Sequence, residues 1–102
     1  MNKYHARPTI VDNVRFASKK EARRYSELLL LLAAGEISNL EMQPRYDIIV
    51  NGCKIGFYKA DFRYISPDGQ SHVEDAKGVS TAVYRLKKRI VEAMYHITIE
   101  EV

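Results

Sequence analysis

A helical repeat of apolar positions is the first strong pattern in the chain. From position 22 to position 32, apolar side chains recur every three or four residues, which places them on one face of a helix. Ser18 and Glu21 precede this stripe with the spacing of a capping box, and Gly35 favours a helix end. The pattern predicts a helix of about four turns, preceded by an arm or a short edge strand. The stripe consists of Ala22, Tyr25, Leu28, Leu29 and Leu32.

The next part of the chain has the shorter alternation that is typical of strands. Two short runs, residues 40–43 and 46–50, are separated by Pro44, which lacks the N–H that a strand ladder needs. Asn51-Gly52 is a strong signal for a tight hairpin turn. This turn leads into a longer predicted strand over residues 54–65.

A second turn and a second helix follow the hairpin. Residues 66–69, Ser-Pro-Asp-Gly, favour a turn into a strand over residues 71–77. Ser80 or Thr81 can cap a helix that runs to about Tyr95. The predicted core stripe of this helix consists of Val83, Leu86, Ile90, Val91 and Met94.

The order of these elements predicts a mixed sheet. Residues 97–102 alternate like a strand, and the helix before them forms a crossover, which places this strand parallel to the one at residues 71–77. We therefore expect an α/β (α+β) fold with the order α-β-β-β-α-β, a mixed central sheet flanked by helices. A chain of 102 residues is enough for one domain, so residues 1–102 are expected to form a single unit.

Composition narrows the classes of protein that the chain can belong to. The longest apolar run, residues 28–34, is far shorter than the roughly 20 residues of a membrane helix. The polar N-terminus shows no secretory signal. The single cysteine, Cys53, cannot form an internal disulfide or a zinc cluster. We expect a cytoplasmic protein with no membrane partner, and the net charge of +3 slightly favours anionic partners.

Charged residues on neighbouring predicted strands have the chemistry of a metal-dependent nuclease. Residues two apart in a strand share a face, so Asp75 and Lys77 point the same way, while Glu74 points to the other side. The turn between the strands brings Asp61 opposite Asp75, close enough to share a cation. Mg²⁺ prefers carboxylate oxygens, and a lysine can orient the attacking water. The competing interpretation is a surface ion pair between strands.

Tyrosines and a further acid in the same strands are expected to be structural. Tyr58 and Tyr64 fall on one face of the predicted strand over residues 54–65, which indicates core packing rather than a base-stacking surface. Glu74 faces away from the predicted metal site.

The acidic pattern resembles the signature of the PD-(D/E)xK nuclease superfamily, here Asp61 followed by Asp75-Ala76-Lys77. From about residue 14 to residue 102, the chain is also similar to small phage and prophage proteins described as Holliday-junction-resolvase-like. Ala60 stands where the motif has proline, and Asp75 where glutamate is commoner. The resemblance implies a restriction-endonuclease-like core and an endonuclease that uses Mg²⁺ or Mn²⁺. The shared pieces are Ser18-Lys19-Lys20-Glu21-Ala22, Gln43-Pro44, Ala60-Asp61-Phe62 and Glu74-Asp75-Ala76-Lys77-Gly78.

The resemblance also assigns residue roles. Asp61 and Asp75 would hold the metal, and Lys77 would act on the water or the phosphate. Glu21 matches a first-helix glutamate that often completes the metal shell in the superfamily, although a capping box explains the same residue. Gln43 is expected either to contact the site or simply to end a strand.

Two basic clusters on the predicted helices are candidate phosphate contacts. Neither helix has the pattern of a recognition helix, so structure-selective binding is favoured over sequence-specific cutting. The competing interpretation is two solvated helix faces. The predicted DNA contacts are Lys19, Lys20, Arg23, Arg24, Lys87 and Lys88, with Gln43 as a further candidate.

The expected partner is branched or duplex DNA. Resolution of a junction requires two symmetric cuts, so a homodimer is expected, in the host cytoplasm if the protein is phage-encoded. A restriction-like or nicking endonuclease shares the same core, and no residue of the chain separates it from a resolvase. A catalytically silent DNA-binding module with the same fold is the alternative from another class.

Overall fold

The computed structural model describes residues 9–11, 14–76 and 80–102. The first predicted helix is confirmed as α1, Lys19–Ala33, which begins where the Ser18 side chain accepts a hydrogen bond from the Glu21 N–H (3.1 Å). Gly35, just beyond the end of α1, has a positive φ of 76°, which glycine adopts without strain. Before α1, the strands β1 (Thr9–Val11) and β2 (Val14–Phe16) form a short antiparallel pair.

The main sheet has four strands in the order β3-β6-β7-β8. Its members are β3 (Ser38–Met42), β6 (Phe62–Ile65), β7 (Ser71–Asp75) and β8 (Ile99–Glu101). The first three strands pair antiparallel, whereas β7 and β8 are parallel and are joined by the helix α2 (Ala82–Tyr95). The predictions of a mixed sheet and a parallel last strand are therefore confirmed. Within the described residues, the fold is mixed α+β with two helices.

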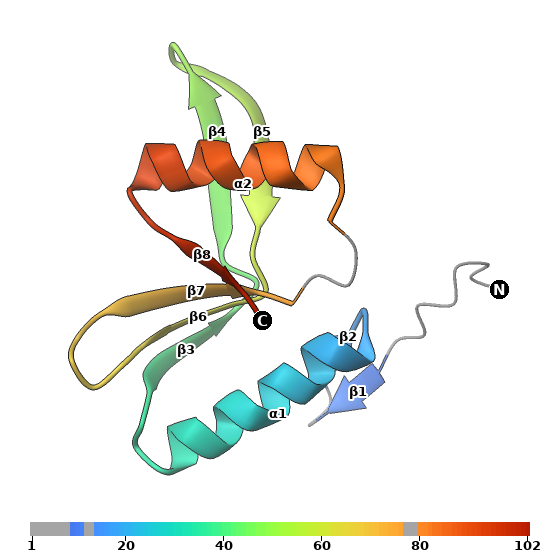
Figure 1. Cartoon of the computed structure of the whole chain (residues 1–102), viewed down its shortest axis with the longest axis vertical. Coiled ribbons are helices and arrows are strands. Elements are labelled where there is room, and N and C mark those ends of the chain that lie inside the picture. The colour runs from blue at the N-terminus through green and yellow to red at the C-terminus, as the bar shows by residue number, and fades with distance from the viewer. Residues whose placement is uncertain (1–8, 12–13, 77–79) are drawn as a thin grey trace, which may run out of the picture.

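The predicted strand over residues 54–65 is wrong, because the structure divides it at a bend. The hairpin around Asn51-Gly52 consists of β4 (Arg45–Val50) and β5 (Cys53–Lys59), and it extends away from the main sheet (Figure 1). Pro44 lies between β3 and β4 and has no N–H to donate. The hydrogen-bond ladder between β3 and β6 therefore cannot continue unchanged into the pair of β4 and β5.

Two backbone hydrogen bonds hold the bend together. The Gln43 N–H donates to the carbonyl of Asp61 (2.9 Å), and the Ala60 N–H donates to the carbonyl of Pro44 (3.1 Å). Gln43 has a positive φ of 53°. Both strands of the long hairpin therefore turn at the same level, with Asp61 at the corner.

Two apolar clusters lie on opposite sides of the main sheet. The α1 cluster contains Phe16, Ala22, Tyr25, Leu28, Ile37, Phe62 and Tyr64. The α2 cluster contains Tyr46, Ile48, Tyr58, Ala60, Val73, Tyr84, Val91 and Ile99. In Figure 1, α1 lies below the sheet and α2 lies above it, in front of β4 and β5. The sheet is thus covered by a helix on each face.

The predicted core stripes of the helices are only partly correct. In α1, Leu32 is 39% exposed and lies outside the buried stripe. In α2, Val83, Leu86 and Met94 are exposed, while Tyr84 and Val91 are buried. The difference arises because α2 lies across β4 and β5, so its buried face is rotated from the predicted one. Among the described residues, no helix is long and apolar enough to cross a membrane.

Candidate functional site

Asp61 and Asp75 lie opposite each other where β6 begins and β7 ends. Phe62 pairs with Glu74 in the β6–β7 ladder, so the preceding Asp61 faces the following Asp75. The Asp61 N–H donates to the Glu74 carbonyl (3.0 Å), and Asp61 Oδ2 accepts from the Ala76 N–H (2.7 Å). The bend therefore fixes the Asp61 carboxylate against the end of the strand that carries Asp75, as the turn between the strands predicted.

Asp75 is fully buried on the α2 face of the sheet, where a tyrosine binds it. The hydroxyl of Tyr58 donates to Asp75 Oδ2. Burial, and then the hydrogen bond to Asp75, raise the pKa of Tyr58, so the phenol remains protonated and acts as the donor. The prediction that Tyr58 and Tyr64 share a face is wrong, because the bend between them resets the alternation. Tyr58 packs on the α2 side and Tyr64 on the α1 side.

A carboxylate on β8 extends this network and was not predicted from the sequence. Glu101 is the register partner of Asp75, so the two side chains lie on the same face. Glu101 Oε2 accepts from the hydroxyl of Tyr84 (2.8 Å) and lies 3.8 Å from Lys88 Nζ. The strand alternation of residues 97–102 indicates which residues share a face, but the pairing of Glu101 with Asp75 depends on a register that no local pattern encodes.

Glu74 points away from Asp75, as predicted. The structure shows that this side is the α1 face, where a bidentate ion pair holds Glu74. Arg24 Nε and Nη2 donate to the two carboxylate oxygens at 2.8 and 2.7 Å, and the Tyr64 hydroxyl donates to Oε2. The hydrogen bond to Glu74 raises the pKa of Arg24, and burial raises the pKa of Tyr64 to about 12. Arg24 also contacts Glu27 at 3.2 Å. The guanidinium predicted to contact DNA is therefore committed to an internal ion pair that ties α1 to β7.

Glu21 lies in the first turn of α1 and is only 6% exposed. Its N–H donates to Ser18 Oγ, which is one half of the predicted capping box. Burial of a carboxylate is costly unless it is paired or binds a cation, so the exposed fraction of Glu21 is compatible with a role beyond capping. Its role as a metal ligand remains a prediction.

Lys77 and Gln43 are two further residues that the sequence assigned to the site. Lys77 lies outside the described residues, as does Gly78, which was predicted to end the strand. Gln43 is exposed, and its N–H binds the carbonyl of Asp61. Gln43 therefore lies next to the carboxylate pair and belongs to the bend that positions Asp61.

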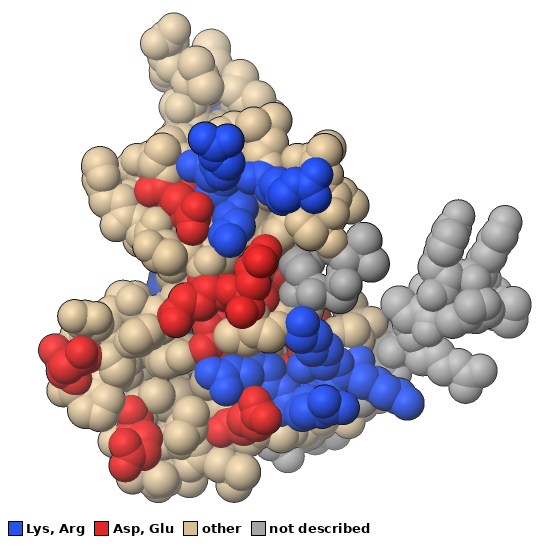
Figure 2. Space-filling view, in the orientation of Figure 1, with Lys and Arg blue, Asp and Glu red and all other residues tan. Residues whose placement is uncertain are grey.

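Basic residues from both helices appear on the face of the molecule that Figure 2 shows. Figure 2 shows one group of Lys and Arg over α1 and another over α2, with acidic side chains between them over β8. Lys19, Lys20 and Arg23 are exposed on α1, and Lys87 and Lys88 are half-buried on α2. The β8 strand that lies between the groups pairs with the end of β7, which carries Asp75.

Residues 1–100 match a family described as "Protein of unknown function (DUF1064)". The chain belongs to the DUF1064 family. The searches among curated proteins and solved structures found no match.

The donor set of this DUF1064 protein has the chemistry of a site for a hard divalent cation. Asp61 and Asp75 supply carboxylate oxygens from adjacent strands, and a carboxylate has more acceptor positions than one hydrogen bond uses. Among the described residues, no three His, Cys, Asp or Glu side chains gather closely enough to form a complete metal shell. A cation held here would therefore keep several waters or bind substrate oxygens, as Mg²⁺ commonly does.

Proposed function

We propose that this DUF1064 protein is a divalent-cation-dependent endonuclease of the PD-(D/E)xK type, with a restriction-endonuclease-like core, and that it acts on branched DNA. The observation that carries the proposal is the position of Asp61 opposite Asp75, at the end of a strand flanked by two basic helices. In the sequence, Lys77 follows Asp75 by two residues. The arrangement supports hydrolysis because it concentrates anionic ligands and surrounds them with phosphate-binding cations.

Asp61 and Asp75 would hold the cation, and Glu21 is a further candidate ligand, although the three carboxylates, all among the described residues, do not form a complete shell in this structure. Bound Mg²⁺ or Mn²⁺ supplies charge neutralisation at the phosphate and a more acidic water. Tyr58 fixes the orientation of Asp75 through its hydroxyl, and the Ala76 N–H fixes Asp61. Both carboxylates are therefore positioned before substrate arrives, which lowers the reorganisation that hydrolysis requires.

The basic residues of the two helices would position the DNA backbone across the carboxylates. Lys19, Lys20 and Arg23 are exposed on α1, while Lys87 is half-buried on α2. Arg24 is not included because Glu74 holds its guanidinium. Such contacts fix the orientation of a backbone without reading its sequence, which favours recognition of DNA shape. Two symmetric cuts at a junction would require a homodimer.

A cleavage assay tests the proposal. The purified protein is incubated with linear duplex, flap and four-way-junction DNA in Mg²⁺, Mn²⁺ or EDTA. We expect cation-dependent cutting with a preference for branched DNA. We also expect Asp61→Asn and Asp75→Asn each to reduce the rate by at least about 100-fold, because loss of a ligand should cost more than the roughly 10–100-fold that is typical for loss of a residue supporting a ligand.

The matched control is Asp68→Asn, since Asp68 lies in the exposed turn at the other end of the β6–β7 pair. This variant should cut at the wild-type rate. Undiminished cutting by a folded Asp75→Asn variant would contradict the active-site assignment. Binding of DNA without any cutting, in either metal, would instead support the catalytically silent module.

A further inference from the structure

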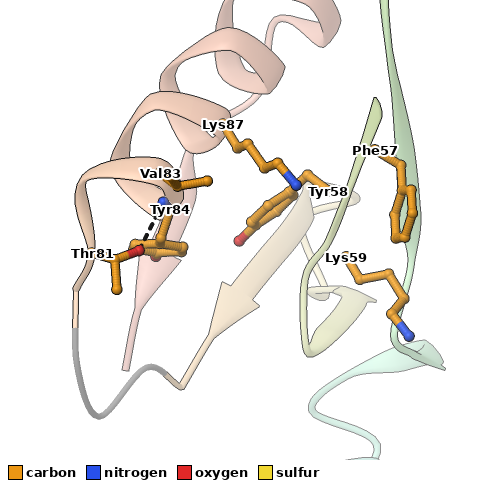
Figure 3. A pocket seen from close by; sticks show the side chains of 7 residues that line it. All are labelled: Phe57, Tyr58, Lys59, Thr81, Val83, Tyr84 and Lys87. Atoms are coloured by element: carbon orange, nitrogen blue, oxygen red, sulfur yellow. Dashed lines mark hydrogen bonds between the residues drawn. The ribbon is translucent and has the colours of Figure 1, made fainter. Parts of the chain in front are cut away.

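A small cavity of about 270 Å³ lies beside the carboxylate site, between β5 and the N-terminal half of α2. Tyr58 and Tyr84 lie between the two elements, and Lys87 extends from α2 towards β5 (Figure 3). Tyr58 joins the cavity to the site, because its ring lines the cavity while its hydroxyl binds Asp75. The volume is near the lower end of the range for small-ligand pockets, so a single nucleotide is the scale of ligand that it fits.

The charge around this cavity favours an anion. Its seven lining residues include Lys59 and Lys87 and no acidic residue. Among the described residues, neither lysine forms an ion pair, whereas Lys88 on the same helix contacts Glu101. The first turn of α2 also lacks an acidic residue, so its positive end is not neutralised locally.

A strand pairing near the cavity adds to the positive charge. Arg45 and Lys59 are direct cross-strand neighbours, and like charges in that position are destabilising. Asp47 offsets Arg45 at 3.3 Å and Lys54 at 3.5 Å. Within the part of the chain that the structure describes, Lys59 has no such partner, so an anion bound beside it would relieve the repulsion.

An exposed aromatic ring lies between these cations. Phe57 is 39% exposed and lies on the opposite side of β5 from Tyr58 (Figure 3). The Arg45 guanidinium lies 3.9 Å from the centroid of its ring, and Lys87 Nζ lies 5.8 Å from it. Aromatic rings and guanidinium planes are the surfaces on which unpaired bases stack in proteins that bind single strands.

We propose that the edge of β5 and the N-terminal half of α2 bind one unpaired nucleotide of a DNA strand. Its base stacks on Phe57, and its phosphate lies between Lys59 and Lys87. The inference rests on the proposed nuclease function, because it assigns the unpaired strand of a branched substrate to a place beside Asp75. A paired base within a duplex cannot present its face to Phe57, so the site distinguishes DNA with an unpaired strand, such as a flap, from fully paired DNA.

Binding without catalysis tests this site. The full chain is titrated in EDTA against a fluorescent hairpin duplex with or without a short single-stranded thymidine tail. We expect the tail to tighten binding, and we expect Phe57→Leu to weaken binding of the tailed DNA by at least about fivefold, the lower limit for the stacking of one base on an aromatic ring. Binding of the blunt duplex should change by less than about twofold, and Phe57→Tyr should restore the preference for the tail.

The lysines are tested through the salt dependence of binding. The double variant Lys59→Gln, Lys87→Gln should make the dependence of log affinity on log salt concentration less steep. The magnitude of the slope should fall by about 0.7 for each phosphate of the tail that a lysine no longer neutralises. Lys54→Gln is the matched control, because Lys54 lies on the same strand but is paired with Asp47 and does not line the cavity. An equal fall in the slope for Lys54→Gln would assign the effect to general charge and overturn the site.

Free nucleotide is the second possible source of the same chemistry. If thymidine 5′-monophosphate displaces the tailed DNA at the same concentration as a free thymidine oligonucleotide of the tail's length does, the assignment of the site to a DNA strand is overturned. Equal affinity of wild type and Phe57→Leu for tailed DNA, in a protein that cuts DNA with Mn²⁺, overturns the site and leaves the nuclease proposal standing. Phe57-dependent binding by a protein that cuts no DNA supports the site and contradicts the nuclease.

Discussion

Replacement of Arg24 by methionine should destabilise the protein strongly, although arginines on helix surfaces are usually tolerant of change. Arg24 makes two charge-assisted hydrogen bonds to Glu74, whose side chain is 2% exposed. Methionine keeps much of the side-chain volume but donates no hydrogen bond. The Glu74 carboxylate would then stay buried without its positive partner, and the hydroxyl of Tyr64, which is uncharged, would still donate a hydrogen bond to it.

The magnitude follows from this burial. Removing one partner of a buried ion pair costs about 3–5 kcal/mol, because the other charge is left uncompensated. The Arg24 side chain is 24% exposed, so water can replace part of its hydrogen bonding, and we expect a loss of about 2–4 kcal/mol. For a domain of this size, 1 kcal/mol shifts Tm by roughly 4–8 °C. The expected fall in Tm is therefore about 8–32 °C.

Urea denaturation and thermal melting of Arg24→Met and Arg23→Met provide the measurement. Arg23 is the exposed neighbour on the same helix, and its replacement should change stability by less than about 0.5 kcal/mol. Glu74→Gln, alone and combined with Arg24→Met, completes a double-mutant cycle that isolates the coupling of the pair. A loss below about 1 kcal/mol for Arg24→Met would show that the pair behaves as a surface salt bridge, and the structural role assigned to Arg24 would be wrong.

Three further predictions concern buried polar groups. The pKa of Tyr64 is raised to about 12, so the stability that its protonated hydroxyl contributes is complete below pH 10 and is lost as pH rises through 12. Urea titrations should therefore show a smaller fall in the free energy of unfolding at alkaline pH for Tyr64→Phe than for wild type. Glu21→Gln should reduce the cleavage rate at least about tenfold and leave the melting temperature unchanged, whereas the control Glu36→Gln, at an exposed position, should change neither quantity. Equal cleavage rates for Glu21→Gln and wild type would show that Glu21 is only a helix cap. Tyr58→Phe should weaken Mn²⁺ binding about tenfold by releasing Asp75 from its donor, as calorimetry would measure; unchanged affinity would contradict a positioning role.

The helices and the tight turns could be predicted because their determinants are local. Ser18 caps α1, Thr81 caps α2, and Asn51-Gly52 forms the hairpin turn, each through contacts within a few residues. The parallel position of β8 followed from the handedness and length of the crossover. The opposition of Asp61 and Asp75 could be predicted because a short turn fixes the register of the strands that it joins.

The features that the sequence did not reveal depend on contacts between distant segments. The bend at Ala60 requires a hydrogen bond from the Gln43 N–H and another to the Pro44 carbonyl, and both residues lie far earlier in the chain. The buried face of α2 depends on the angle at which it crosses β4 and β5, and so Tyr84 replaced the predicted Val83 and Leu86. The contact between Asp75 and Tyr58 follows from the bend, because only the shifted alternation turns Tyr58 towards β7.

The bend also separates a constrained part of the hairpin from a tip that is free to vary. Below it, β3 and β6 form the ladder that sets the position of Asp61, so an insertion between their paired residues would shift the carboxylate. Above it, the tip around Asn51-Gly52 is exposed, and no neighbouring atom lies within 4 Å of the point that a Cβ at residue 52 would occupy. Loop tips of this kind accept added residues at little thermodynamic cost. The tip is therefore a suitable attachment point for a fluorophore or an affinity tag, because residues added there leave the ladder that positions Asp61 unchanged.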